Sequence, residues 1–132
     1  MSDAPHDPDY AVLDPADVDP EPFPESGLPH RKLTRALGCT DLRVNAVTLD
    51  PGAATAPHAH GRQEELYVAL DGGTVVVDGT AHDVPAGGLV RLGPDPVRSV
   101  RNDADEPRRW LMVGAPPVGE VTDFGEYVVP EE

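Results

Sequence analysis

Residues 51–72 read PGAATAPHAHGRQEELYVALDG, and the interpretation of the whole chain starts from them. In an extended segment, residues i and i+2 point to the same face, so His58 and His60 can reach one point in space. Gly61 lets the chain turn, and the next strand can then bring Glu65 beside the two imidazoles. Two neutral imidazoles and one carboxylate suit Fe(II), and Zn, Mn, Ni or Co also accept this set. The stretch therefore predicts a site for one divalent transition metal.

Two residues close to this set, Glu64 and Tyr67, each have more than one possible role. Glu64 is the alternative carboxylate, but Glu65 is preferred because Tyr67 and Ala69 share its face of the strand. Tyr67 is a candidate catalytic residue that would line the cavity as an acid or hydrogen-bond donor. The alternative role for Tyr67 is packing on a half-buried strand.

The rest of the chain predicts an all-β fold. Short apolar or alternating segments are separated by Gly, Pro and Asp turns at intervals of about 8–12 residues. Asp78-Gly79 is the signal of a type I′ hairpin, and helical spacing is confined to residues 33–37. This pattern favours a sandwich or a small barrel. The predicted strands are 42–49, 65–70, 74–77, 81–84, 89–92, 97–101, 109–113 and 127–129.

The central stretch resembles the first motif of the cupin superfamily, a Gly followed by His-x-His, a Glu and a second Gly. Every element has a counterpart, in the order Gly52, His58, His60, Glu65 and Gly72. The resemblance covers roughly residues 42–115. It implies a double-stranded β-helix (jelly-roll) barrel, commonly a homodimer, with the metal inside the barrel mouth.

The second cupin motif is matched only in part. Gly88, Pro94 and Asn102 fit it, but Pro96 replaces a glycine. The fourth metal ligand of the family, a His, is absent, and Arg98 stands in its place three residues before Asn102.

Arg98 changes what the site is expected to bind. Its guanidinium carries a permanent positive charge, which opposes a divalent cation, so the sequence predicts either low metal occupancy or a compensating anion. In one interpretation Arg98 is a catalytic residue that binds a carboxylate or phosphate of the substrate. In the other, Arg98 points away and pairs with a surface acid such as Asp95 or Asp103.

The charge is distributed unevenly along the chain. The 132 residues include 24 acidic and 10 basic ones, for a net charge of −14. Residues 1–30 hold eight acidic residues and seven prolines but no Lys or Arg, so this arm carries −8 and residues 31–132 carry −6. This composition predicts an irregular or disordered arm over 1–30, with packing across a partner subunit as the alternative. Residues 31–132 would form a single cupin barrel.

Composition also limits the location and the partners. The acidic charge argues against binding to nucleic acid or to an anionic membrane surface. Nine arginines against one lysine, with excess acid, are typical of a halophile's cytoplasmic protein, because molar salt screens carboxylate repulsion. The lone Cys39 fits a reducing compartment. The chain shows no signal-like start and no apolar run of about 20 residues, so a cytoplasmic protein is expected.

Two functions are consistent with these features. The first is a small metal-binding cupin, dioxygenase- or isomerase-like, that acts on a small polar or anionic molecule. The alternative is a non-catalytic module that binds a small ligand, suggested by the missing fourth His. Whether the chain is an enzyme stays open. Both faces of the central strands are apolar, with Leu66, Val68 and Leu70 facing away from Glu65, which predicts a homodimer.

Overall fold

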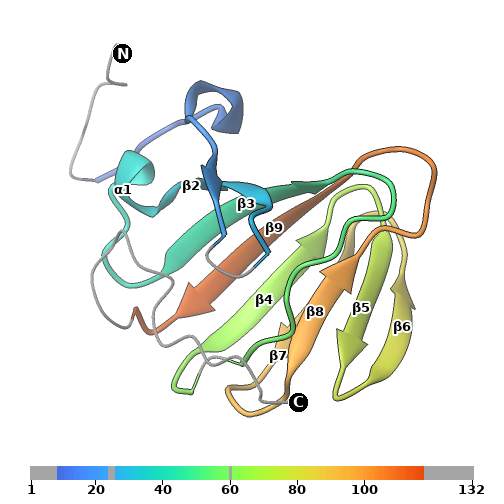
Figure 1. Ribbon diagram of the computed structural model, residues 1–132. Coiled ribbons are helices and arrows are strands. Elements are labelled where there is room, and N and C mark those ends of the chain that lie inside the picture. The colour runs from blue at the N-terminus through green and yellow to red at the C-terminus, as the bar shows by residue number, and fades with distance from the viewer. Residues whose placement is uncertain (1–8, 24–25, 60, 118–132) are drawn as a thin grey trace.

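Two antiparallel β-sheets make up most of the computed structural model, which describes residues 9–23, 26–59 and 61–117 (Figure 1). The larger sheet has six strands in the order β1-β2-β3-β9-β4-β7, and the smaller has three in the order β6-β5-β8. The predicted strand 127–129 lies outside the described residues. The elements are η1 (Pro15–Asp17), β1 (Glu21–Pro22), β2 (Pro29–Lys32), α1 (Thr34–Leu37), β3 (Arg43–Leu49), β4 (Glu64–Ala69), β5 (Gly73–Val77), β6 (Thr80–Val84), β7 (Gly88–Leu92), β8 (Arg98–Arg101) and β9 (Arg108–Ala115).

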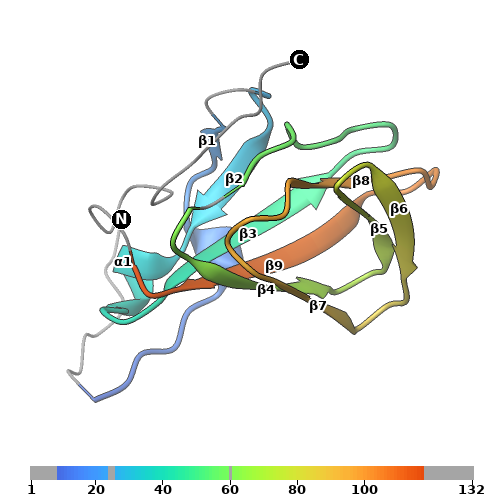
Figure 2. The ribbon, with the colours of Figure 1, turned by 90° about the horizontal axis from the view of Figure 1, so that it is seen from below.

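The two sheets close on each other as a barrel. Figure 2 shows β3, β9, β4 and β7 curving round to face β8, β5 and β6. The all-β jelly-roll prediction is confirmed, and the strands predicted within the described residues lie within one or two residues of the observed ones. The hairpin between β5 and β6 has φ values of 47° at Asp78 and 83° at Gly79, the left-handed pair that a type I′ turn requires.

Alternation along the strands sets the core. On β9, Trp110 and Met112 point inward and are buried, while Leu111 and Val113 face outward. Trp110 meets Tyr67 of β4 edge to face, with ring centroids 6.4 Å apart. The cluster also contains Val47 and Leu49 of β3. This apolar half of the barrel supports a polar half nearer its mouth.

The last part of the arm belongs to the larger sheet. In its described residues the arm has one 3-10 turn, η1, and then the hairpin of β1 and β2, and β2 pairs with β3 through His30 and Val47. His30 is buried and stacks on Phe23, with ring centroids 4.0 Å apart at 13°. The hairpin thereby fixes Phe23 beside the barrel mouth. None of the helices in the described ranges is long and apolar enough to cross a membrane.

Candidate functional site

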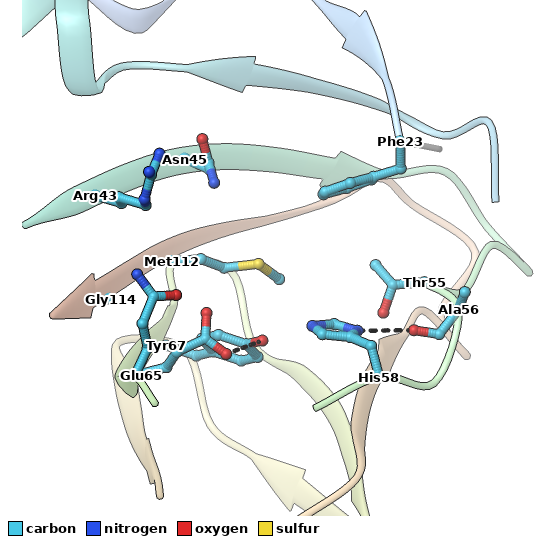
Figure 3. A pocket seen from close by; sticks show the side chains of 11 residues that line it. Phe23, Arg43, Asn45, Thr55, Ala56, His58, Glu65, Tyr67, Met112 and Gly114 are labelled. Carbon is cyan, nitrogen blue, oxygen red and sulfur yellow. Dashed lines mark hydrogen bonds between the residues drawn. The ribbon is translucent and has the colours of Figure 1, made fainter. Parts of the chain in front are cut away.

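A small cavity lies inside the barrel mouth (Figure 3). Its volume of about 30 Å³ has room for a metal ion or one or two water molecules. It is lined from β3, β4, β9, the segment before β4 and the connection between β1 and β2. The lining includes Phe23, Arg43, His58, Glu65, Tyr67 and Met112. The cavity therefore combines two of the predicted ligands and one of the predicted catalytic residues.

His58 is held by the backbone of β8. The backbone N–H of His58 donates to the Arg98 carbonyl at 3.0 Å, and the backbone N–H of Arg98 donates back to the His58 carbonyl at 2.8 Å. The ring Nδ1 lies 2.9 Å from the Ala56 carbonyl, which can only accept, so Nδ1 carries the proton and Nε2 carries the lone pair. Burial, together with the charge of Arg98, lowers the His58 pKa to about 4. The ring is therefore neutral at pH 7, as a metal ligand must be.

Glu65 is the carboxylate of the cavity. Along β4, Glu65 and Tyr67 point inward, and the Tyr67 hydroxyl donates to Glu65 Oε1 at 3.0 Å. Glu64 faces outward and pairs with Arg91 at 2.9 Å. Burial raises the Glu65 pKa to about 7, although Arg98 and the Tyr67 hydroxyl act in the opposite direction. The structure thus places Glu65 in the cavity and leaves Glu64 outside it.

Arg98 points into the barrel. Its side chain is completely buried, its Nε lies 3.7 Å from Glu65 Oε1, and its Nη2 donates to the Gly93 carbonyl. The expected alternative of a surface pair with Asp95 or Asp103 is wrong. Asp103 pairs instead with Arg101, because alternation along β8 turns Arg101 outward when Arg98 is inward.

The side chains of His58 and Glu65 are suited to bind a metal ion. A neutral imidazole whose other nitrogen donates to a carbonyl, beside a buried carboxylate, is the usual environment of a His and Glu ligand pair. His60, the third predicted ligand, lies outside the described residues. Within the described residues, no group of three or more His, Cys, Asp or Glu side chains is placed to hold a metal. The ligand set of His58, His60 and Glu65 therefore stays a prediction.

Arg43 and Asn45 are cavity residues that the sequence reasoning missed. Both project from β3 toward the cavity in Figure 3, and Arg43 is only 3% exposed. The inward face of β3 is polar at Arg43 and Asn45 and apolar at Val47 and Leu49. That change of polarity along one face of a strand was the available signal, because the polar half marks the cavity and the apolar half marks the core.

Fold and site together define a small antiparallel β-barrel with a buried polar cavity at its mouth. Residues 45–114 match the family described as cupin domain, and the chain belongs to this family. No curated protein matches its sequence.

Solved structures show the same fold. A sugar phosphate isomerase from a cupin superfamily, from Silicibacter pomeroyi, is 25% identical with a TM-score of 0.70, and the match covers 79% of this chain and 74% of that one. A predicted oxalate decarboxylase from Thermotoga maritima is 19% identical with a TM-score of 0.67, over 79% of this chain and 97% of that one. A polyketide cyclase from Streptomyces resistomycificus is 23% identical with a TM-score of 0.67, over 79% of this chain and 78% of that one. The variety of their names agrees with a fold that hosts several chemistries.

Proposed function

We propose that this protein is a mononuclear metal-binding cupin with His58, His60 and Glu65 as ligands, acting on a small polar molecule. The observation that carries the proposal is the state of His58. Its ring is neutral and buried, it shares the cavity with Glu65, and its Nδ1–H is fixed by the Ala56 carbonyl. Metal-bound histidines almost always donate their other N–H in this way, to a carbonyl or a carboxylate.

The chain's own residues would prepare the site for chemistry. A bound metal would supply Lewis acidity or, if it is iron, oxygen activation. The Tyr67 hydroxyl orients Glu65 and places a proton donor 3.0 Å from its carboxylate. Phe23 and Met112 contribute apolar surface that limits the entry of water. Because the cavity holds only a few atoms, a substrate enters when a lining side chain moves.

The substrate class follows from charge. Arg43 lines the cavity and Arg98 lies next to Glu65, so two of the ten cationic residues in a chain whose net charge is −14 are in or beside the cavity. An anionic group on the substrate would be attracted there. The sugar phosphate isomerase and the predicted oxalate decarboxylase among similar structures bear names with anionic substrates, which agrees with an enzyme that acts on a small anion.

Metal analysis of protein purified without a His tag tests the proposal. We expect one equivalent of metal, or its uptake on titration with Fe(II), Zn(II), Mn(II) or Ni(II). Glu65→Gln should weaken binding at least tenfold, because it removes the only charged ligand of the set. Glu64→Gln is the matched control and should bind as the wild type does. The proposal is wrong if the wild type takes up none of the four metals.

The ion pair of Arg98 with Glu65 favours a second candidate, a non-catalytic module that binds a small ligand. A carboxylate already paired at 3.7 Å with a buried guanidinium is less available to a metal. Such a module would show thermal stabilisation by a small anion without turnover. Formation of product from any screened substrate would exclude it.

A further inference from the structure

Arg98 is both completely buried and incompletely hydrogen-bonded. Its Nη2 donates to the Gly93 carbonyl, but Nε and Nη1 have no hydrogen-bond acceptor among the residues described. The Nε contact with Glu65 Oε1, at 3.7 Å, is an ion pair that is too long for a hydrogen bond. A buried cationic N–H without an acceptor is unfavourable, and such groups in native proteins commonly mark the place of a water or an ion.

The backbone prevents Arg98 from moving away. The two hydrogen bonds between the backbones of His58 and Arg98 lock the ligand-bearing segment against β8. Alternation on β8 buries Arg98 and Val100 and directs Ser99 and Arg101 outward. The guanidinium is therefore fixed beside Glu65 and close enough to His58 for its charge to act on both, although it does not itself line the cavity.

Charge counting shows what this arrangement requires. Without metal, Glu65 and Arg98 cancel. A divalent ion would bring the pair to +2, whereas a neutral His at position 98 would leave only +1. Arg98 also contributes no lone pair, so one more coordination position stays open than in a four-ligand site.

We propose that a divalent metal and a small oxyanion bind to this site cooperatively, and that Arg98 couples the two. The inference rests on the proposed function and names its co-ligand class. The oxyanion supplies negative charge and a donor oxygen for the open coordination position. It also supplies an acceptor for the guanidinium. Because coupling is reciprocal, each partner raises the affinity for the other.

The test measures Co(II) affinity by titration of the full chain under two salts of equal ionic strength. Sodium formate is the oxyanion probe, since formate is the smallest carboxylate and asks for the least displacement of the lining side chains, and sodium perchlorate is the weakly ligating control. We expect formate to tighten Co(II) binding to the wild type at least tenfold and to change the visible spectrum of bound cobalt. A parallel titration with inorganic phosphate distinguishes a carboxylate from a phosphate preference.

Two variants separate coupling from folding defects. Arg98→His restores a fourth ligand and removes the charge, so it should bind Co(II) at least tenfold more tightly than the wild type in perchlorate. It should gain less than threefold from formate. Arg101→His is the matched control, since Arg101 lies on the same strand but outside the barrel, and it should behave as the wild type does.

The outcomes distinguish the two proposals. Wild-type protein that binds Co(II) equally well in both salts, or an Arg98→His variant as responsive to formate as the wild type, overturns the coupling and leaves the metal site standing. Wild-type protein that binds no Co(II) in any of the three salts overturns the metal site itself, and the coupling with it.

Discussion

His30 shows how burial fixes the charge of one residue. It is 1% exposed, and burial lowers its pKa to about 4, with Lys32 acting in the same direction. The unfolded chain takes up the proton near pH 6.5, but the folded chain does so only near pH 4. The contribution of His30 to folding stability is therefore fully present above about pH 6.5. It is lost as the pH falls toward 4, by roughly 3 kcal/mol in total.

His30→Phe isolates this contribution because it keeps the ring that stacks on Phe23 and removes the titration. Urea unfolding at several pH values between 4 and 7 measures the effect. The stability difference between wild type and variant should shrink or reverse as the pH falls, while Glu65 and His58 titrate in both proteins and cancel in the difference. Parallel stability curves over this range would contradict the prediction.

Asn102, the last residue of the partial second motif, has a structural role. Its Nδ2 donates to the carbonyls of Leu49 at 2.9 Å and Glu106 at 2.7 Å, and its Oδ1 accepts from the Ala104 N–H at 2.8 Å. Asn102→Ala removes all three bonds and leaves buried backbone groups unpaired, which should cost about 2–3 kcal/mol at about 1 kcal/mol each. Urea unfolding tests this, and a loss below about 0.5 kcal/mol would contradict it.

At the scale of elements, the close approach of β5 to β9 allows a direct test of core packing. A Cβ at Gly73 would lie 2.7 Å from Cζ2 of Trp110, whose side chain is fully buried and cannot withdraw. Gly73→Ala should therefore cost about 1–3 kcal/mol by overpacking. Gly93→Ala is the matched control, since a Cβ there meets no atom within 4 Å. Thermal unfolding of both variants checks the difference, and equal melting temperatures would refute it.

Elements were easier to predict from the sequence than side-chain directions. Alternation and turn residues are local signals, so β3, β4 and the hairpin at Asp78 were expected nearly where they lie. The direction of Arg98 depends instead on pairing with His58, a contact between distant parts of the chain that no local pattern contains. Arg43 was missed for a related reason, because an arginine that begins a strand is usually solvated.

At the scale of the whole molecule, the outer face of the larger sheet carries an apolar patch bordered by the ion pair of Glu64 and Arg91. Leu66 and Val68 of β4 point away from the cavity beside Leu89 of β7 and Leu111 and Val113 of β9, and Leu89 is 66% exposed. We propose that a second copy of this chain covers this face as a homodimer, since single chains rarely leave such a contiguous patch in water. The net charge of −14 repels a second copy at low salt.

Because the chain is acidic and the patch is apolar, dimerisation should depend on the salt concentration. Added salt screens the repulsion between carboxylates and leaves the apolar contact in place, so the dimer should tighten as ionic strength rises. Light scattering coupled to gel filtration at low and at molar KCl measures this, and a monomer at molar KCl would contradict the dimer. Leu89→Glu puts a charge at the most exposed residue of the patch, on the edge strand β7, and should shift the protein to monomer at all salt concentrations. Val12→Glu adds the same charge at another exposed apolar residue, 80% exposed and on the arm rather than on the larger sheet, so it should leave the dimer intact. If both variants dissociate equally, net charge governs association and the outer face of the larger sheet is not the interface.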